Sequence, residues 1–344
     1  MHGGNIYEKE NRINLDFSVN TNPLGIPKVL AEAFRHAGEW AGRYPDLEVD
    51  ALRKALADTK GCEASQILCG NGASELIMLY CQALQPKKAL MPVPTFTGYA
   101  HGLQTVDAVI EEYLLNKEQG YLLDAGFVQC LNQTDADLVI LCRPNNPTGR
   151  LIPKELLEEV MQVTRERQIA LLVDECFLDF TKEHQDSLVA RLEDFPNLSV
   201  LQAFTKNYCL PGVRLGMLYT ADTELLRQMK RRRPEWNVST IAQELGLLIC
   251  KEAEGLALTR ELVRIEKRYL TEHLSGLGFI VTESEANFIH FQGPAGLEQK
   301  LEQQGILIRQ LGDLAGMTER DYRIAVRTQV ENRQLLDALQ KVIN

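Results

Sequence analysis

The sequence predicts an α/β fold, in which helices cover both faces of a mostly parallel sheet of seven strands and a smaller α/β domain follows. Between residues 66 and 219, short apolar runs alternate with longer segments of helical periodicity, which is the pattern of parallel strands joined by crossover helices. After residue 237 the chain changes to long helical stretches and a short strand–helix–strand tail. The length of 344 residues fits about two domains.

Two segments precede the small domain. Residues 1–25 are rich in Gly, Asn and Pro and are predicted to form an ordered N-terminal arm rather than a helix. Residues 26–237 form the predicted large domain, which begins with one helix after Pro27 and another over 48–60. The strands of its sheet are expected at 66–69, 88–91, 109–113, 138–142, 170–173, 200–204 and 215–219.

The predicted small C-terminal domain covers residues 238–344. Two long helices, over 239–252 and 255–275, open it, and a helix over 330–342 closes it. Its strands are expected at 287–291, 305–309 and 322–327. The sequence has no internal repeat and no low-complexity tract, so no long disordered linker is expected.

Charge and cysteine content narrow the class of protein. The 37 Lys and Arg against 47 Asp and Glu give a net charge of −10, which disfavours binding of nucleic acid or an anionic membrane through bulk charge. The eight cysteines form no C-x-x-C pair, so neither a zinc site nor a disulfide framework is expected. The N-terminus is no signal peptide, and no apolar stretch is long enough to span a bilayer. A cytoplasmic protein is therefore expected.

A lysine and an arginine follow the predicted strand 200–204. Lys206 comes directly after this strand, and Arg214 lies eight residues further on, between Gly212 and Gly216. A lysine beside a buried strand is costly unless its amine is paired, neutral or covalently used, and these are the properties of a Schiff-base lysine. An arginine between glycines can hold a phosphate closely. Taken alone, the pair is also typical of a surface loop that binds ions.

Three further motifs lie at strand ends or at the turns that follow strands. Asp174 follows the apolar run 169–173, where ligands of open α/β sheets bind, although it can equally cap the next helix. The segment 144–149, Pro-Asn-Asn-Pro-Thr-Gly, follows strand 138–142 and is, by itself, simply a turn. The segment 70–75, Gly-Asn-Gly-Ala-Ser-Glu, can offer backbone N–H groups to a phosphate, but it is neither a dinucleotide fingerprint nor a P-loop.

The order of these motifs is more specific than any one of them. Gly-x-Gly-Ala-Ser-Glu, Asn-Asn-Pro-Thr-Gly, Asp-Glu-x-Phe, Thr-Lys and Pro-Gly-x-Arg-x-Gly follow one another along the chain. This succession resembles the fold type I pyridoxal-phosphate enzymes of the class I and II aminotransferase family, and the resemblance covers nearly the whole chain.

The resemblance implies pyridoxal 5′-phosphate as the cofactor and a role for each matching residue. Lys206 is implied to form the Schiff base, Asp174 to keep the ring nitrogen protonated, and Asn146 to bond the phenolic oxygen. Phe96 is implied to stack on the ring. The residues implied to hold the cofactor phosphate are Gly72, Ala73, Ser74, Thr205 and Arg214, together with Tyr44 reaching over from a second subunit of a homodimer.

Within the family, the chain resembles the branch that contains the histidinol-phosphate aminotransferases and the L-threonine O-3-phosphate decarboxylases. The His-Gly-Gly-Asn start, the segment 16–25, the phenylalanine of Asp-Glu-Cys-Phe and the arginines of the tail favour the decarboxylases. The implied reaction converts L-threonine O-3-phosphate to (R)-1-amino-2-propanol O-2-phosphate in cobalamin biosynthesis. The alternative is histidinol-phosphate aminotransferase or a related transaminase, because both reactions use the same lysine and ring.

The same resemblance implies a small phosphorylated amino acid as substrate. Arg323 is implied to bind its α-carboxylate and Arg309 its phosphate, since two anionic groups need two separate cationic binding groups. Without the resemblance, each arginine is also typical of a strand-end salt bridge. The other residues implied to contact the substrate or to close the pocket are His2, Gly3, Asn22 and Asn146.

Four positions depart from the family pattern or stay open. Phe177 stands where a tyrosine is usual, which is expected to raise the pKa of the Schiff base, and Ala203 stands where a hydroxyl residue often binds the phosphate. Arg143 replaces a usually small residue and either contacts an anionic substrate or covers the sheet end. Arg327 is either a supporting residue or a surface charge. A third hypothesis is that the chain is a non-catalytic binding protein. It is disfavoured because a binding protein needs no Schiff-base lysine.

Overall fold

The computed structural model describes residues 3–4, 6–7, 12–252 and 256–343. Its centre is a sheet of seven strands in the order β2-β8-β7-β6-β5-β3-β4. β8 runs antiparallel to both of its neighbours, and the other pairs are parallel. The strands are β2 (Ile67–Gly70), β3 (Lys88–Val93), β4 (Val109–Leu114), β5 (Leu138–Cys142), β6 (Ala170–Asp174), β7 (Leu198–Ala203) and β8 (Gly216–Thr220). The predicted sheet and fold class are confirmed.

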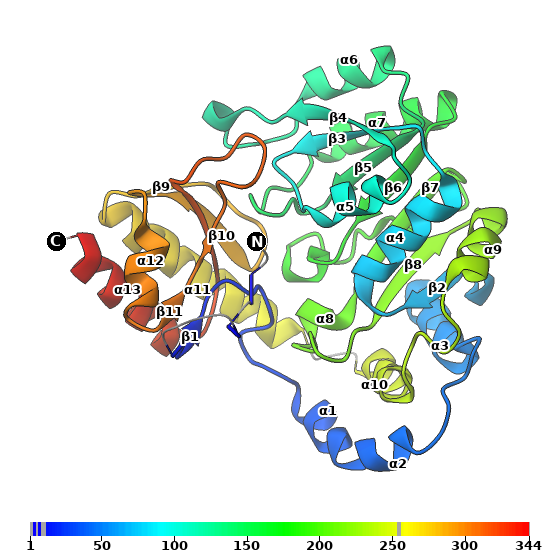
Figure 1. The fold of residues 1–344 in the computed structure, drawn as a ribbon, viewed down its shortest axis with the longest axis horizontal. Helices are drawn as coiled ribbons and strands as arrows, with labels where there is room; N and C mark the ends of the chain where they lie inside the picture. Colours follow the sequence, from blue (N-terminus) through cyan, green and yellow to red (C-terminus); the bar gives the residue numbers. More distant parts are fainter. Residues whose placement is uncertain (1–2, 5, 8–11, 253–255, 344) are drawn as a thin grey trace.

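Helices cover both faces of this sheet (Figure 1). On one face, α6 (Ala125–Gln133), α7 (Lys154–Glu166) and α10 (Thr240–Lys251) share a core with alternate strand residues. On the other face, α4 (Gly72–Leu84), α5 (Gly98–Gln104) and α9 (Thr223–Arg232) share a second core with the intervening strand residues. The apolar runs therefore bury both faces of each central strand, which is why the sequence shows them as continuous rather than alternating.

The helices follow local signals in the sequence. α7 starts after Pro153 and buries one stripe, Leu156, Leu157, Val160, Met161 and Thr164, at helical spacing. α9 starts at Asp222, whose carboxylate accepts from the Leu225 N–H at 2.9 Å. A basic run, residues 230–233, lies at the end of α9, where positive charge is favourable next to the helix dipole.

Before the sheet, the chain forms α1 (Lys28–Ala33), α2 (Ala37–Ala41) and α3 (Asp50–Lys60). The first predicted helix is thus interrupted, because a short 3₁₀ turn at Phe34–His36 separates α1 from α2. The second predicted helix, over 48–60, begins two residues later than expected, after Val49, whose φ is 56°. α8 (Phe204–Asn207) is a single turn that directly follows β7.

A smaller unit follows the long helix α11 (Ala257–Gly276). Its sheet has the order β12-β13-β10-β9, and all of its pairs are antiparallel. The strands are β9 (Ile280–Val281), β10 (Phe288–Gln292), β12 (Arg309–Gln310) and β13 (Asp321–Ala325), packed with α12 (Leu297–Glu302) and α13 (Gln329–Ile343). The predicted strand 305–309 is split at Ile308 into β11 (Ile306–Leu307) and β12.

The N-terminal segment joins this small unit. β1 (Leu15–Asp16) pairs in parallel with β11, and Figure 1 shows the two strands side by side. Phe17 is fully buried in the small core, and its carbonyl accepts from the Ala325 N–H at 2.8 Å. Arg327 donates to the Asp16 carbonyl at 3.1 Å and pairs with Glu331. Of the two roles left open for Arg327, the structure shows a supporting one.

The division into 1–25, 26–237 and 238–344 stays a prediction. The packing favours a later start of the small unit, because Val238, Ala242, Leu245 and Ile249 lie in the same core as the large sheet. In the part of the chain that the structure describes, no helix has the length and apolar character needed to cross a membrane.

A buried polar cluster orders the small sheet. The Asp321 carboxylate is 1% exposed and accepts from Gln292 at 2.6 Å, from the N–H and hydroxyl of Thr318 at 2.8 and 2.7 Å, and from His290 at 3.1 Å. Burial alone raises the pKa of Asp321, but the hydrogen bonds from His290, Thr318 and Gln292 outweigh burial and hold this pKa well below its ordinary value.

We expect Asp321→Asn to lower the free energy of unfolding near neutral pH by about 3 kcal/mol, because an amide nitrogen then faces buried donors. A lowered folded-state pKa means that the contribution of Asp321 is complete above the unfolded pKa of about 3.9 and declines as the pH falls below it. The difference between wild type and variant must therefore shrink in acid. Denaturant unfolding followed by circular dichroism measures it, with exposed Asp337→Asn as the control. An equal loss in both variants contradicts the prediction.

Candidate active site

A cavity of about 370 Å³ lies at the carboxyl ends of β5, β6 and β7 and extends to the small sheet and the segment 18–20. Carboxyl ends of parallel strands are where open α/β sheets bind ligands. The structure brings together eleven of the residues predicted from the sequence. These are Gly3, Ala73, Ser74, Phe96, Asn146, Asp174, Thr205, Lys206, Arg214, Arg309 and Arg323.

Lys206 lies in α8, the single turn after β7, and its side chain lines the cavity. Burial, followed by the charges of Arg323 and Arg214, lowers its pKa to about 8. A much larger fraction of this amine is uncharged at neutral pH than in an ordinary lysine, whose pKa is about 10.4. The amine is thus suited to nucleophilic attack on a carbonyl group.

Asp174 ends β6 and is 6% exposed. Its two oxygens accept hydrogen bonds from the Tyr99 hydroxyl at 2.7 Å and from the Cys176 N–H at 2.9 Å. Burial raises the pKa of Asp174, and these two hydrogen bonds oppose the rise because they favour the carboxylate. The result is a carboxylate held in a fixed orientation at the floor of the cavity.

Tyr99 is the main functional candidate that the sequence analysis missed. It is fully buried and lies in the first turn of α5, three residues after Phe96, whose ring it contacts edge-on at 5.5 Å. Spacing of three residues places two side chains on one side of a helical turn. The sequence signal was therefore present in the segment 96–99, but the partner of Tyr99 lies 75 residues away in the chain.

Arg214 lies against the N-terminus of α4. A Cβ atom at Gly72 would be 2.5 Å from an Arg214 guanidinium nitrogen, and Gly72 has a φ of 78°, so only glycine fits there. Ala73 and Ser74 follow in the first turn of this 13-residue helix. Unpaired N–H groups, the helix dipole and the guanidinium together favour an anion at this end of the cavity.

Two arginines of the small sheet line the other side of the cavity. Arg323 donates to the Asn146 side-chain oxygen and, at 2.8 Å, to the Ser18 carbonyl. Arg309, its cross-strand neighbour, donates to both carboxylate oxygens of Asp313 at 2.9 and 2.8 Å. Burial and the nearby Arg309 charge lower the pKa of Arg323. This side of the cavity is therefore a second anion-binding region.

The predicted site residues Gly72, Asn22 and Tyr44 do not line the cavity. Asn22 does not line the cavity, because its side-chain amide donates to the Asn207 carbonyl at 2.8 Å and to Thr259 at 3.0 Å. Its predicted contact with substrate stays a prediction, and its hydrogen bonds anchor the chain near Lys206. Tyr44 is 81% exposed and packs on Trp236 at 5.0 Å. His2 lies outside the described residues.

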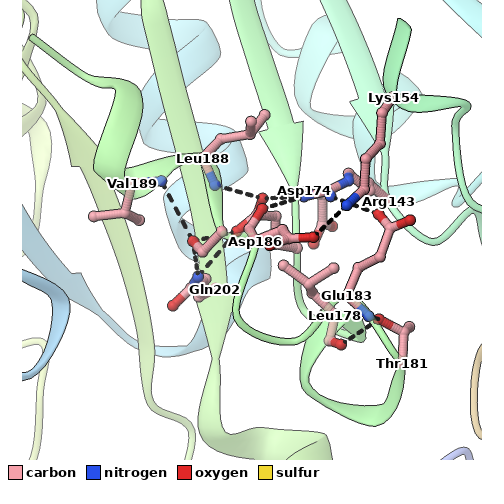
Figure 2. A network of polar contacts seen from close by, with 12 residues as sticks. Arg143, Lys154, Asp174, Leu178, Thr181, Glu183, Asp186, Leu188, Val189 and Gln202 are labelled. Atoms are coloured by element: carbon pink, nitrogen blue, oxygen red, sulfur yellow. Dashed lines mark hydrogen bonds and ion pairs between the residues drawn. The ribbon is translucent and has the colours of Figure 1, made fainter. Parts of the chain in front are cut away.

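Of the two roles left open for Arg143, its position directly after β5 favours covering the sheet end over contacting substrate. It is 1% exposed, forms ion pairs with Glu175 and Glu183 at 3.0 and 2.8 Å, and does not line the cavity. Figure 2 shows Arg143 within this network of polar contacts. The sequence analysis missed these partners because Glu183 lies on a loop 40 residues further along the chain.

The two departures from the family pattern both face the cavity. Phe177 packs edge-on against Phe288 at 5.0 Å, and Ala203 ends β7. Cys142, Cys176, Thr95, Thr97 and the segment 18–20 also line the cavity, and none of them was predicted. The free thiols of Cys142 and Cys176 are buried, which raises their pKa values.

The fold, the buried lysine and the two anion-binding regions match a known family. Residues 12–339 match the family of class I and II aminotransferases, and the chain belongs to this family. It is 33% identical over 352 aligned residues to the threonine-phosphate decarboxylase of Salmonella typhimurium, covering 99% of this chain and 96% of that protein.

Two aminotransferases are also similar. The histidinol-phosphate aminotransferase of Desulfitobacterium hafniense (strain Y51) is 30% identical, covering 94% of this chain and 90% of that protein. The crystal structure of the histidinol-phosphate aminotransferase from Clostridium acetobutylicum superposes with a TM-score of 0.89 at 28% identity, covering 96% of this chain and 99% of that one. The predicted family is confirmed.

The lowered pKa of Lys206 can be tested by reductive labelling with a small aldehyde and borohydride across a pH series. Only the uncharged amine reacts, so labelling of Lys206 should reach half its maximum near pH 8, well below the value of about 10.4 of an ordinary lysine. Arg323→Met removes a nearby positive charge and should raise the Lys206 midpoint. Peptide mass spectrometry measures the labelling of Lys206 in each sample. A Lys206 midpoint at or above about 10.4 contradicts the interpretation.

Proposed function

We propose that the chain is a pyridoxal 5′-phosphate-dependent decarboxylase that converts L-threonine O-3-phosphate to (R)-1-amino-2-propanol O-2-phosphate. The observation that supports it most strongly is the placement of cationic groups around one buried amine. Arg214 and the start of α4 lie at one end of the cavity, and Arg309 and Arg323 line its other side. The cofactor phosphate, the substrate carboxylate and the substrate phosphate are three anionic groups, and each needs its own cationic binding group.

The residues of the cavity fit the cofactor. Lys206 has a lowered pKa, Asp174 lies at the cavity floor, and Phe96 supplies an aromatic ring. When bound, pyridoxal phosphate supplies an aldehyde for covalent attachment and a protonated ring that accepts the electron pair released at the substrate α-carbon. Gly72, Ala73, Ser74, Thr205 and Arg214 would hold its phosphate, and Asn146 its phenolic oxygen.

Lys206 has two tasks in this proposal. Its amine, whose pKa is lowered by burial and by Arg323, would hold the cofactor and would then be displaced from it by the substrate amine. The released amine afterwards returns a proton to the substrate α-carbon. An amine with a pKa of about 8 suits proton transfer in both directions near neutral pH.

Asp174 and Tyr99 act together on the ring nitrogen. The carboxylate of Asp174 would accept the ring N–H, and the Tyr99 hydroxyl and the Cys176 N–H, which donate to it at 2.7 and 2.9 Å, favour its charged form. A negative charge at this position stabilises the proton on the ring nitrogen. Tyr99 is therefore a positioning residue for Asp174.

Arg323 and Arg309 would determine which bond breaks. Arg323 would bind the substrate α-carboxylate and Arg309 the substrate phosphate, after exchanging Asp313 for it. Fixing both ends of the substrate can set the bond from Cα to the carboxylate perpendicular to the ring, and such positioning accounts for much of the rate of an oriented reaction. Gly3, next to Ser18, would close the pocket.

The second candidate function is transamination of histidinol phosphate or a related amine. The similarity to histidinol-phosphate aminotransferases in sequence and in structure favours it. A transaminase uses the same residues but aligns the Cα–H bond instead. The similarity to a threonine-phosphate decarboxylase over nearly the full length of both chains places decarboxylation first.

Incubation of the holoenzyme with L-threonine O-3-phosphate should release carbon dioxide without any 2-oxo acid. Arg323→Gln should reduce kcat/KM by about 100-fold, since loss of a charged hydrogen-bonding group costs about 3 kcal/mol, and Lys206→Ala should abolish turnover. Labelled carbon dioxide and product analysis measure the reaction. Turnover of a phosphorylated amine only when a 2-oxo acid is supplied would show transamination and overturn the decarboxylase proposal.

We also propose that the site is completed in a cytoplasmic homodimer, with Tyr44 reaching the cofactor phosphate of the partner subunit. The exposed Tyr44 and Trp236 pair supports an interface, since exposed aromatic clusters are typical of interfaces. All eight cysteines are free thiols, as in a reducing compartment.

Mixing an inactive variant with a weakened one tests the shared site. Lys206→Ala and Tyr44→Ala, refolded together, should form hybrid dimers in which one site has both native residues, so activity should rise well above that of either variant alone. Sedimentation should give a dimer, and Lys206→Ala mixed with itself is the control. No gain in activity from proven hybrid dimers contradicts the role of Tyr44 across the interface.

A further inference from the structure

Three strands of the large sheet present alternate side chains to opposite sides at their carboxyl ends. Cys142, Asp174 and Ala203 line the cavity. Their neighbours Arg143, Glu175 and Gln202 do not line it and, because successive strand residues point to opposite faces, lie behind it. All three are polar and buried, at 1%, 2% and 8% exposure.

Arg143 connects β5 to β6 and to the loop that follows β6. Its guanidinium donates to Glu175 at 3.0 Å, to Glu183 at 2.8 Å and to the Asp186 carbonyl at 2.9 Å. Its backbone N–H donates to the Asp174 carbonyl at 2.8 Å. At the outer end of the network, Lys154 pairs with the Asp186 carboxylate at 2.6 Å (Figure 2).

Glu175 connects this arginine to β7. Besides Arg143, its carboxylate accepts from the Leu188 N–H at 3.0 Å, from Ser187 at 2.6 Å and from Gln202 at 3.1 Å. Gln202 also donates to Ser187 at 3.0 Å. We call Arg143, Glu175, Glu183, Ser187 and Gln202 the rear network.

Three members of the rear network, Gln202 in β7 and the residues that directly follow β5 and β6, are each close in sequence to a residue of the site. Arg143 stands three residues before Asn146, Glu175 directly follows Asp174, and Gln202 stands four residues before Lys206. The network thus joins the three strand ends that hold the phenolate donor, the ring-nitrogen partner and the amine of the proposed function.

Stability alone does not account for such a network. Taking two charges out of water costs about as much as their pairing returns, and well-packed apolar residues at such sites are often as stable or more so. Charged hydrogen bonds do, however, define direction and distance more strictly than apolar contacts. The observed geometry has both partners buried and four donors on one carboxylate, which restricts the movement of the three strand ends.

We propose that the rear network positions the active site, with Arg143 and Glu175 as positioning residues that set the placement of Asn146, Asp174 and Lys206 relative to one another. This inference rests on the proposed use of pyridoxal phosphate but not on which substrate reacts.

The test compares Arg143→Met, Glu175→Gln and the double variant Arg143→Met/Glu175→Gln in the holoenzyme. Three quantities are measured at a temperature where circular dichroism shows the variants to be folded: kcat and KM, the pH midpoint of the absorbance change of the bound cofactor, and the thermal midpoint. The matched control is Glu158→Gln, which removes the partner of Arg191 at 2.9 Å in the same domain without touching a strand that ends at the site.

We expect each single variant to lower kcat by about 10- to 100-fold, the loss that a misplacement of about 1 Å produces, with a smaller change in KM. The absorbance midpoint should shift in the same direction in both single variants, because both displace the same residues. In the double variant, which removes both charges of the Arg143–Glu175 ion pair and leaves only Glu183 without its arginine, the thermal midpoint should recover in part while kcat stays low. Glu158→Gln should match wild type in kcat and in the absorbance midpoint.

Two outcomes overturn the proposal. Recovery of kcat together with the thermal midpoint in the double variant would show a purely structural role. Shifts of the absorbance midpoint in opposite directions in the two single variants would show that the charges of Arg143 and Glu175 act on the cofactor electrostatically and do not act by positioning the site residues.

Two further choices keep the test decisive. If Arg143→Met does not fold, Gln202→Met takes its place, since it removes one neutral donor from Glu175 and leaves the ion pair intact; an unchanged kcat and absorbance midpoint in that variant overturn the proposal. If the wild type does not decarboxylate threonine phosphate, the proposed substrate fails, and the absorbance titration of the bound cofactor still tests the rear network by itself.

Discussion

The whole site depends on keeping one lysine amine buried among positive charges. Lys206 lies in a cavity that also contains Arg214, Arg309 and Arg323, and burial together with the charges of Arg323 and Arg214 lowers its pKa. The protein has a net charge of −10, so this positive cavity is a local property. Hydrogen bonds hold two of the arginines in place, Arg309 with Asp313 and Arg323 with Asn146 and the Ser18 carbonyl.

The cavity also depends on how the small sheet rests on the large one. Asn146 accepts from Arg323, and the Glu285 N–H donates to the Gly149 carbonyl at 2.8 Å. A Cβ atom at Gly149 would lie 2.0 Å from the Ser284 hydroxyl, so the glycine allows this close approach. The turn 144–149 is therefore more than a chain reversal, because it is the contact through which the anion-binding arginines of the small sheet reach Lys206.

The rear network gives the same strand ends a second, opposite-facing set of contacts. Asp174 faces the cavity and Glu175 faces Arg143, because consecutive strand residues alternate. The side chains that bind ligand and those that hold the backbone are thus adjacent in sequence but separated by the thickness of the sheet. Positions next to predicted site residues in this family merit the same attention as the site residues themselves.

The sequence by itself determined the fold class, the seven strands and eleven of the residues that line the cavity, because these depend on local patterns: apolar runs, glycine turns and motifs at strand ends. It did not indicate that Tyr99 bonds Asp174, that Asn22 turns to Thr259, or that Arg143 pairs with Glu183. These contacts join residues 75, 237 and 40 positions apart. Only the tertiary structure decided them, since a buried polar side chain takes the partner that packing brings within hydrogen-bond distance, and local sequence does not specify that partner.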